Sequence, residues 1–275
     1  MDTQDAARWD EVADSWSASQ PQSLWRSYCD AAHRQWLSAE LGDRKFQRAL
    51  KTDAFDELAG DGGLARDLAS RANSLVQIDI SRRALHHAHE KAPQAQPTAA
   101  DCRKLPFADG SFDLVFSNST LDHLDSLEQV AGSLAELYRV LSPGGLLLVT
   151  LDNLRNPVIA LRNRLPERLL TRHDLVPYQL GPTCGPGPLR RMLREVGFDP
   201  VSLRALMHCP RLPAIRLAAA RERRGDANVV SFVRGALAWE RLAHWPTRYW
   251  TGYFVAASAT RADAPQGRPR CDKTR

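Results

Sequence analysis

The sequence lacks any apolar run that approaches the roughly 20 residues a helix needs to cross a bilayer. Its opening stretch, MDTQDAARWDEVADSW, is acidic and contains no apolar core, so it does not have the pattern of a secretory signal. We therefore expect a cytoplasmic protein with no transmembrane segment.

The sequence also lacks paired cysteines. None of its five cysteines lies in a C-x-x-C pair, and an odd, scattered set argues against both a disulfide framework and a zinc site. We expect isolated reduced thiols at Cys29, Cys102, Cys184, Cys209 and Cys271.

The remaining composition is ordinary for a globular domain, with 43% hydrophobic and 25% charged residues over 275 positions. The net charge of +5 is unevenly placed, because six arginines gather between positions 204 and 224. Such a stretch either attracts phosphates or an anionic membrane, or forms a solvated face. Net basic charge alone is weak support for RNA, so we expect no nucleic-acid partner.

Residues 1–45 have the pattern of helices that are rich in tryptophan. Trp9 and Trp16 recur at helical spacing, and so do Trp25 and Trp36 further along. We expect an N-terminal helical cap, packed either on the core or over a ligand.

The central part of the chain alternates short apolar runs with amphipathic helical stretches. This alternation predicts an α/β fold, with a parallel sheet covered by helices on both faces. The predicted strands are 46–52, 74–80, 97–101, 112–117, 146–151, 198–203 and 249–258. The predicted helices are 64–72, 82–91, 126–141, 189–196 and 211–245.

One domain is expected over residues 46–260. Its alternation is interrupted at 153–186, a stretch with five prolines and no strand pattern, which predicts a lid-like insertion after the fifth strand. The polar, proline-rich tail 261–275 is expected to be disordered.

Acidic or amide side chains lie at or just after the ends of the first four predicted strands. Asp53 comes after the first, Asp79 and Asp101 lie at the ends of the second and third, and Asn118 follows the fourth. Each Asp could be a helix N-cap, but ligands of open α/β sheets bind at the carboxyl ends of the strands. Because carboxylates brought together repel one another, a ligand with hydroxyl or amino groups would supply their partners.

The spacing narrows the class of ligand. Asp79 lies 19 residues after Gly60, an interval at which an acid binds a ribose diol in dinucleotide folds. Asp53, Asp56 and Glu57 make the first loop acidic, and negative charge there would repel a pyrophosphate. An adenosine cofactor with a cationic centre fits better, which disfavours a nicotinamide dehydrogenase.

The run DCRKLPFADGSFDLVFSNSTLDHL (101–124), followed by LAELYRVLSPGGLLLVTLDN (134–153), resembles class I S-adenosylmethionine-dependent methyltransferases of the type 11 group. The match covers about residues 74–152 and extends more weakly through REVGF (194–198). The resemblance implies a Rossmann-like, seven-stranded sheet whose last strand runs antiparallel, with S-adenosylmethionine as cofactor.

The resemblance also implies roles for particular residues. Asp79 would bind both ribose hydroxyls, and Ile80 would pack on the adenine. Asp101 would accept the adenine amino group, while Cys102 would donate its backbone N–H to the ring. Ser117 and Asn118 would line the methionine portion.

The first loop departs from the family pattern, which is an acid followed by G-x-G-x-G. If Glu57 is the acid, the loop is ELAGDGG, which includes Gly60 but lacks two of the three glycines. If Asp53 is the acid, the loop is longer. We favour Asp53, because Asp56 and Glu57 would be costly inside a buried strand.

Methyl transfer to a hydroxyl is helped by a general base. His123 follows the fourth strand and has a pKa range that suits this role, and Asp122 could orient it. The alternative is that Asp122 caps a turn and His123 only forms a hydrogen bond. Candidate substrate contacts follow the fifth strand: Asn153, His173, Tyr178 and Thr183.

The tryptophan-rich cap and proline-rich insertion favour a closed pocket for a small acceptor, methylated on oxygen or nitrogen. Two alternatives remain open. One is a non-catalytic binding or partner protein on the same scaffold. The other is a methyltransferase acting on RNA or at a membrane surface through the arginines of 204–224. The sequence leaves the oligomeric state undetermined.

Overall fold

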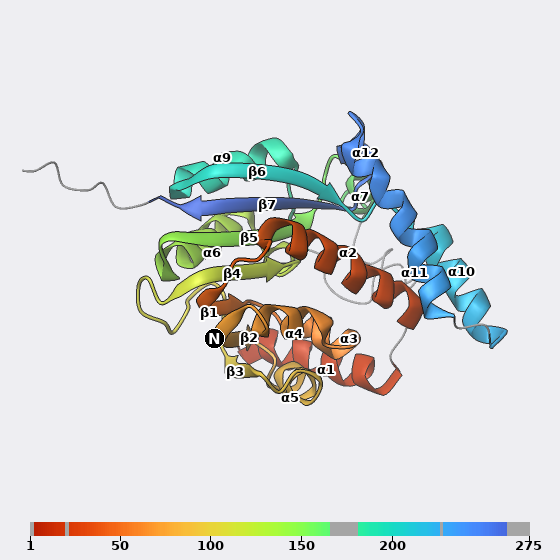
Figure 1. Cartoon of the computed structure of the whole chain (residues 1–275), viewed down its shortest axis with the longest axis horizontal. Helices are drawn as coiled ribbons and strands as arrows, with labels where there is room; N and C mark the ends of the chain where they lie inside the picture. The colour runs from red at the N-terminus through yellow and green to blue at the C-terminus, as the bar shows by residue number, and fades with distance from the viewer. Residues whose placement is uncertain (1–2, 20–21, 166–180, 226–227, 263–275) are drawn as a thin grey trace, which may run out of the picture.

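A computed structural model describes residues 3–19, 22–165, 181–225 and 228–262. It has a seven-stranded sheet in the order β3-β2-β1-β4-β5-β7-β6 (Figure 1). Every neighbouring pair is parallel except the two that involve β7. The strands are β1 Phe46–Lys51, β2 Ala72–Asp79, β3 Ala95–Ala99, β4 Phe112–Asn118, β5 Leu141–Asp152, β6 Phe198–Leu206 and β7 Phe254–Arg261. The predicted α/β fold with an antiparallel last strand is confirmed.

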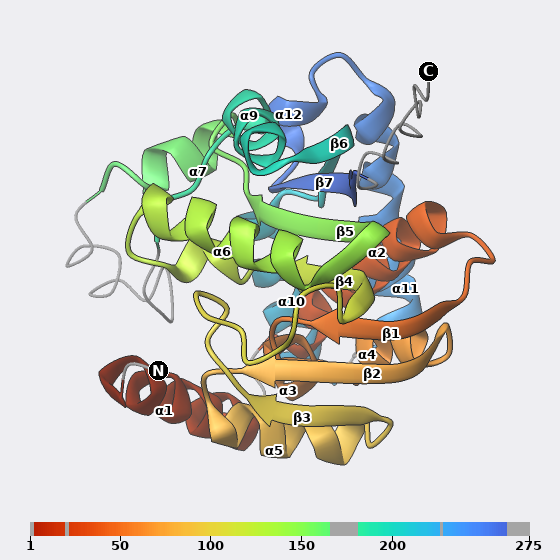
Figure 2. The ribbon, with the colours of Figure 1, turned by 90° about the vertical axis from the view of Figure 1, so that its left-hand side faces the viewer.

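Helices cover both faces of this sheet, and Figure 2 shows α6 and α9 in front of it with α2 and α4 behind. The helices before β4 are α1 Thr3–Ser19, α2 Ser23–Leu41, α3 Phe55–Ala59, α4 Gly63–Ala69 and α5 Arg82–Lys91. Those after it are η1 Leu121–His123, α6 Leu127–Val140, α7 Pro157–Arg162, α9 Pro186–Val196, α10 Arg211–Arg223, α11 Val229–Leu237, η2 Ala238–His244 and α12 Arg248–Thr251. None of these described helices is both long and apolar enough to cross a bilayer.

The central strand β5 shows why the sheet needs helices on both faces. Leu146 and Leu148 belong to the core under α2 and α4, whereas Leu147 and Val149 belong to the core under α6 and α9. Successive side chains of a strand point to opposite faces, so an uninterrupted apolar run requires apolar neighbours on both sides.

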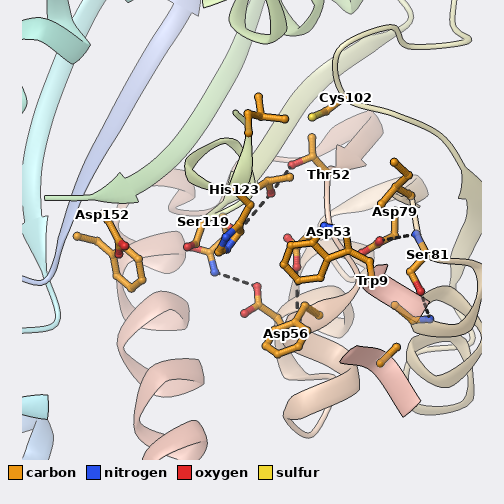
Figure 3. A pocket seen from close by; sticks show the side chains of 18 of the residues that line it. Trp9, Thr52, Asp53, Asp56, Asp79, Ser81, Cys102, Ser119, His123 and Asp152 are labelled. Carbon is orange, nitrogen blue, oxygen red and sulfur yellow. Dashed lines mark hydrogen bonds between the residues drawn. The ribbon is translucent and has the colours of Figure 1, made fainter. Parts of the chain in front are cut away.

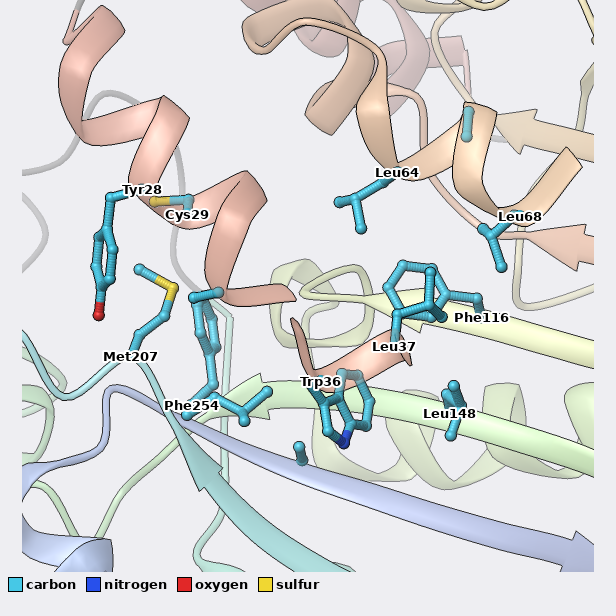
Figure 4. Packing of buried hydrophobic residues seen from close by; sticks show 14 of the residues in the cluster. Tyr28, Cys29, Trp36, Leu37, Leu64, Leu68, Phe116, Leu148, Met207 and Phe254 are labelled. Carbon is cyan, nitrogen blue, oxygen red and sulfur yellow. The ribbon is translucent and has the colours of Figure 1, made fainter. Parts of the chain in front are cut away.

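The tryptophans of the two N-terminal helices divide between the core and the ligand side. Trp36 of α2 packs on Phe116 of β4, with ring centroids 6.1 Å apart (Figure 4). Trp16 of α1 is buried against Phe55 of α3, at 5.0 Å. The first contact joins α2 to the sheet, and the second joins α1 to α3.

Several predicted boundaries are wrong. The stretch from Tyr249 to Tyr253 is not a strand, because residues 248–251 form the short helix α12 and β7 begins only at Phe254. The SPGG stretch (142–145) does not precede β5 but belongs to it. The predicted helix 211–245 is divided into α10, α11 and η2.

Two further differences concern segments at the borders of the domain. The short helix α3 and the N-terminus of α4 occupy the region expected to be an open loop. Arg261, assigned to the tail, ends β7, and residues 263–275 lie outside the described residues. Within the described part of the chain, four cysteines are buried and unpaired: Cys29, Cys102, Cys184 and Cys209.

Candidate active site

A cavity crosses the carboxyl ends of the parallel strands, from β3 to β5 (Figure 3). Its floor is formed by residues that follow the strands, and its opposite wall by α1 and α2. Among the lining residues are Thr52, Asp53, Asp79, Ile80, Asp101, Cys102, Asn118, His123 and Asp152 from the floor, and Trp9, Trp25, Arg26, Cys29 and His33 from the wall. The predicted position of the site, at the strand ends, agrees with this cavity.

Asp79, on the floor of the cavity, is held in place by two backbone groups. Its carboxylate accepts the N–H of Ala54 at 2.9 Å and the N–H of Ser81 at 2.8 Å. Burial raises the pKa of Asp79, and these two hydrogen bonds oppose the rise. The side chain is thus fixed in orientation, with remaining lone pairs for hydroxyl donors of a ligand.

Asp101 is fixed differently, by the guanidinium of Arg103. Arg103 donates through Nε and Nη2 to the carboxylate, at 3.0 and 2.7 Å. Burial alone would raise the pKa of Asp101, but the bonds from Arg103 outweigh it and hold the pKa below its usual value. The adjacent Cys102 also lines the cavity, and burial raises the pKa of its thiol to about 12, so it is a neutral wall group.

The end of β1 carries a buried ionic cluster. Lys51 Nζ lies 2.9 Å from Asp53 Oδ2, 3.4 Å from Asp56 Oδ2 and 3.0 Å from Glu57 Oε2. Burial alone would lower the pKa of Lys51, but the three carboxylates outweigh it and keep the ammonium charged. Burial raises the pKa of both Asp53 and Glu57.

Two of the three carboxylates in this cluster line the cavity and the third does not. Asp53 and Asp56 line it, whereas Glu57 is fully buried behind them and accepts hydrogen bonds from the backbone of Ala65 and the side chain of Gln77. Because β1 ends at Lys51, Asp53 is the first acid after the strand, and its role as the acid of the family pattern stays a prediction.

The glycines after α3 make close approaches to protein groups. A Cβ on Gly60 would fall far inside contact distance of Asp30 Oδ2 and 2.6 Å from the carbonyl oxygen of Asp56. Gly62 has a φ of 79°, the left-handed region, as it starts α4. Gly60 does not line the cavity, so its predicted contact with the cofactor stays a prediction that this position does not favour.

Asn118 connects β4 to the acids after β1. Its Nδ2 donates to Asp56 Oδ2 at 2.9 Å, and its Oδ1 accepts the hydroxyl of Thr150 at 2.7 Å. Ser117 is fully buried and accepts the hydroxyl of Thr52 at 2.9 Å. Asn118 and Thr52 line the cavity, and Ser117 supports them from behind.

His123 and Asp122 follow β4 in the short helix η1. His123 lines the cavity and packs edge-on to Trp9 of α1, with ring centroids 5.2 Å apart. Asp122 is buried and accepts the hydroxyl of Ser119 and, at 2.9 Å, the backbone N–H of Asp152. Burial and the neighbouring Asp152 raise the pKa of Asp122. The base role of His123 and the orienting role of Asp122 stay predictions.

The far end of the cavity contains two arginines that meet one phenol. Arg162 donates to the hydroxyl of Tyr253 at 2.9 Å and pairs with Asp152, while Arg211 donates to the same hydroxyl at 2.5 Å. Arg162 was not identified from the sequence, because Asp152 lies ten positions before it and the pair joins two different elements.

Two of the four predicted substrate contacts, Asn153 and Thr183, lie away from the cavity. Asn153 is buried and donates to the carbonyl oxygens of Tyr249 and Gly252, and Thr183 donates to the carbonyl oxygen of Asp152. Neither side chain lines the cavity. His173 and Tyr178 lie outside the described residues.

The sequence left open that the N-terminal cap lies over a ligand, but did not indicate which side chains of α2 face it. Trp25, Arg26, Cys29 and His33 line the cavity from one side of this helix. The i, i+3, i+7 spacing of residues 26, 29 and 33 was visible in the sequence, but the apolar tryptophan pattern dominated the interpretation.

The residues present fit an adenosine cofactor with a cationic sulfur. Carboxylates at the ends of β2 and β3 can accept hydroxyl and amino donors, and Ile80 offers an apolar surface between them. The carboxylates of Asp53 and Asp56 make the middle of the cavity favourable for positive charge.

Comparison with solved structures identifies the class of fold. The N-methyltransferase NodS from Bradyrhizobium japonicum, solved with S-adenosylhomocysteine, superposes with a TM-score of 0.51 at 16% identity, covering 83% of this chain and 85% of that one. This likeness shows a shared fold.

Comparison of the sequence identifies the family of the central part. Residues 56–149 match the family model described as methyltransferase domain. The malonyl-[acyl-carrier protein] O-methyltransferase of Enterobacter lignolyticus is 34% identical over 114 residues, 42% of each chain. The demethylmenaquinone methyltransferase of Beutenbergia cavernae is 37% identical over 126 residues, 46% of each chain. The chain thus spans about half the length of the curated relatives it matches. The resemblance to class I S-adenosylmethionine-dependent methyltransferases is confirmed.

Proposed function

We propose that the protein transfers a methyl group from S-adenosylmethionine to a small-molecule acceptor, on oxygen or nitrogen. The observation that carries this proposal is Asp79, whose carboxylate is oriented at the cavity wall by the N–H groups of Ala54 and Ser81. A carboxylate fixed in this way after β2 is suited to bind a ribose diol. The family match over residues 56–149 supports the same activity.

Each predicted cofactor residue at the cavity has a part in this proposal. Asp79 accepts the ribose hydroxyls and Asp101 the adenine amino group, while Ile80 packs on the ring and the Cys102 N–H donates to it. Asn118 then lies beside the methionine portion.

When bound, the cofactor supplies a methyl group attached to positively charged sulfur. The chain positions the acceptor in line with that methyl group and excludes water, since Trp9 and Trp25 close the wall opposite the strand ends. His123 lines the same cavity, with Asp122 behind it, and is one candidate to take the acceptor's proton if the acceptor is a hydroxyl.

Isothermal calorimetry with S-adenosylhomocysteine tests the proposal. We expect a complex with the wild-type protein, and no heat up to millimolar concentration would reject it. A screen of metabolites with a labelled methyl donor then identifies the acceptor.

A second candidate is a non-catalytic partner protein on this scaffold. It is favoured by α3, which stands where an open glycine loop would admit the cofactor. This candidate predicts binding of S-adenosylhomocysteine that is absent, or unchanged by Asp79→Ala.

The basic stretch gives less support to an RNA or membrane partner. Arg204 pairs with Glu40 at 2.9 Å, and Arg211 bonds to Tyr253, so two of its arginines are engaged within the molecule.

A further inference from the structure

Helix α2 contributes two nitrogen-bearing side chains, seven residues apart, to the lining of the cavity. Arg26 and His33 both line the cavity, with Cys29 between them. Seven residues of α-helix rise about 10 Å and return to the same helix face, so the backbone positions of the two residues are roughly that far apart along the helix.

His33 has one nitrogen engaged and one without a partner. Its side chain is 3% exposed, and Nδ1 lies 2.9 Å from the carbonyl oxygen of Cys29. A carbonyl can only accept, so Nδ1 carries the hydrogen and Nε2 carries the lone pair. Among the described residues, Nε2 has no hydrogen-bond partner although it is buried. A buried acceptor left in this state is costly, which calls for an occupant.

Arg26 also has a buried nitrogen without a hydrogen-bond partner among the described residues, but this nitrogen is a donor. Its guanidinium lies over the rings of Trp16 and Phe55, at 4.5 and 5.0 Å. Its Nε is buried and has no hydrogen-bond partner within the described part of the chain. No carboxylate of the described residues pairs with it within 4.0 Å, so it offers a charged donor to the cavity.

His33 lines the same cavity as Asn118, and its surroundings keep it neutral. Its ring contacts Phe254, the first residue of β7, with centroids 5.5 Å apart. Burial lowers the pKa of His33, and Lys51 lowers it further, against the opposing effect of Asp56 and Glu240. Asp56 in turn is bonded to Asn118, at the end of β4, beside the proposed methionine portion.

We propose that the methyl acceptor is a hydroxy acid that lies along α2, with its hydroxyl donating to His33 Nε2 and its anionic group bound by Arg26 Nε–H. This inference rests on the proposed function and names its substrate class. One donor and one acceptor, both buried and unpartnered on one helix face, match a molecule with a hydroxyl at one end and an oxyanion about 10 Å away.

The proton of the acceptor then has a defined destination. As the hydroxyl oxygen bonds to the methyl carbon, its proton passes to His33 Nε2 and the carbon–sulfur electron pair stays on sulfur. The products are a methyl ether, neutral S-adenosylhomocysteine and an imidazolium, so the positive charge moves from sulfur to His33.

The test titrates 8-hydroxyoctanoate by calorimetry into full-length protein saturated with S-adenosylhomocysteine. Octanoate, which lacks the hydroxyl, and octane-1,8-diol, which lacks the carboxylate, are the matched probes. We expect 8-hydroxyoctanoate to bind about tenfold more tightly than either. Equal binding of the three, or binding of none, overturns the inference while the S-adenosylhomocysteine complex still supports the proposed function.

Two variants assign the two ends. His33→Phe should remove the preference for the hydroxyl and leave octanoate binding unchanged, and Arg26→Gln should remove the preference for the carboxylate and leave the diol unchanged. His86→Phe, on the exposed side of α5, should change neither. If either variant at α2 weakens all three probes equally, its role is structural and the inference is rejected.

A spectroscopic measurement is independent of these affinities. The imidazole ¹⁵N signal of His33 Nε2, assigned by its loss in His33→Phe, should shift when 8-hydroxyoctanoate binds and stay in place with octanoate. A signal that responds to neither probe contradicts the proposed contact.

Discussion

Lys51 Nζ lies 3.0 Å from Glu57 Oε2, and neither side chain is exposed to solvent. The ammonium also pairs with Asp53 and Asp56, so one buried cation balances three carboxylates next to the proposed cofactor site. Such a group is costly to bury and more costly to break, because removing one partner leaves uncompensated charge.

Replacing Lys51 with methionine should therefore destabilise the protein strongly. The variant keeps most of the side-chain volume but leaves the acids without their cation, and we expect a loss of about 3–5 kcal/mol in the free energy of unfolding at pH 7. Urea denaturation measures it.

The pH dependence of that loss provides its control. Without the ammonium, the pKa of Asp53 and Glu57 stays above that of the unfolded chain, so the loss should shrink as the pH falls towards about 4–5. Lys45→Met, at an exposed lysine just before β1, should cost less than about 0.5 kcal/mol. A loss independent of pH would contradict the electrostatic explanation.

Gly60→Ala should be destabilising although alanine is the better helix former. A Cβ there would collide with Asp30 Oδ2 and with the backbone oxygen of Asp56, which cannot move cheaply. We expect a cost of about 1–3 kcal/mol, measured by thermal or urea unfolding.

Gly235→Ala is the matched change, since Gly235 lies inside α11 with nothing within 4 Å of the added carbon. It should stabilise by about 0.5–1 kcal/mol. If both changes have the same sign, the close approach at Gly60 is not what selects glycine.

Asp30→Asn should stabilise the protein at alkaline pH. Burial raises the pKa of Asp30 to about 8, with Asp56, Asp61 and Glu57 adding to the rise. A carboxyl whose folded pKa is raised contributes stability fully below its unfolded value, about 4, and loses it as the pH rises towards 8.

The asparagine has no such dependence, so the two proteins should be equally stable near pH 4 and the variant should be the more stable at pH 8 and above. Unfolding curves from pH 4 to pH 9 measure this difference. Asp43→Asn, at an exposed position, should give a flat difference over the same range.

Asp79→Asn should weaken binding of S-adenosylhomocysteine about tenfold or more, because a hydrogen bond to a charged acceptor contributes about 1.5–3 kcal/mol. Asp113→Asn is the control: its carboxylate also accepts two backbone N–H groups, from Gln47 and Arg48 at 2.6 and 2.9 Å, but near the start of β4. Both variants should lose stability, and only Asp79→Asn should lose affinity in calorimetry. Unchanged affinity in both would falsify the ribose role of Asp79.

Much of the fold could be predicted because its signals are local. The run from Leu146 to Leu151 predicts a strand buried on both faces, and the structure places alternate residues in two cores. Asp79 is the last residue of β2 and Asp101 lies two residues after β3, so parallel pairing alone brings them to one edge. The prediction of one strand over 249–258 was wrong, because its apolar residues are divided between the short helix α12 and β7.

The sequence by itself determined the order of strands and helices along the chain, the acids at the strand ends and the methyltransferase resemblance. Each of these depends on residues that are neighbours in the sequence. Only the tertiary structure decided which groups meet. The cluster around Lys51 depends on how α3 packs against the end of β1, and the cavity wall of Arg26 and His33 depends on how α2 lies opposite the strand ends. Such contacts depend on how the elements pack together in the fold, and the hydrophobic periodicity of a sequence does not predict them.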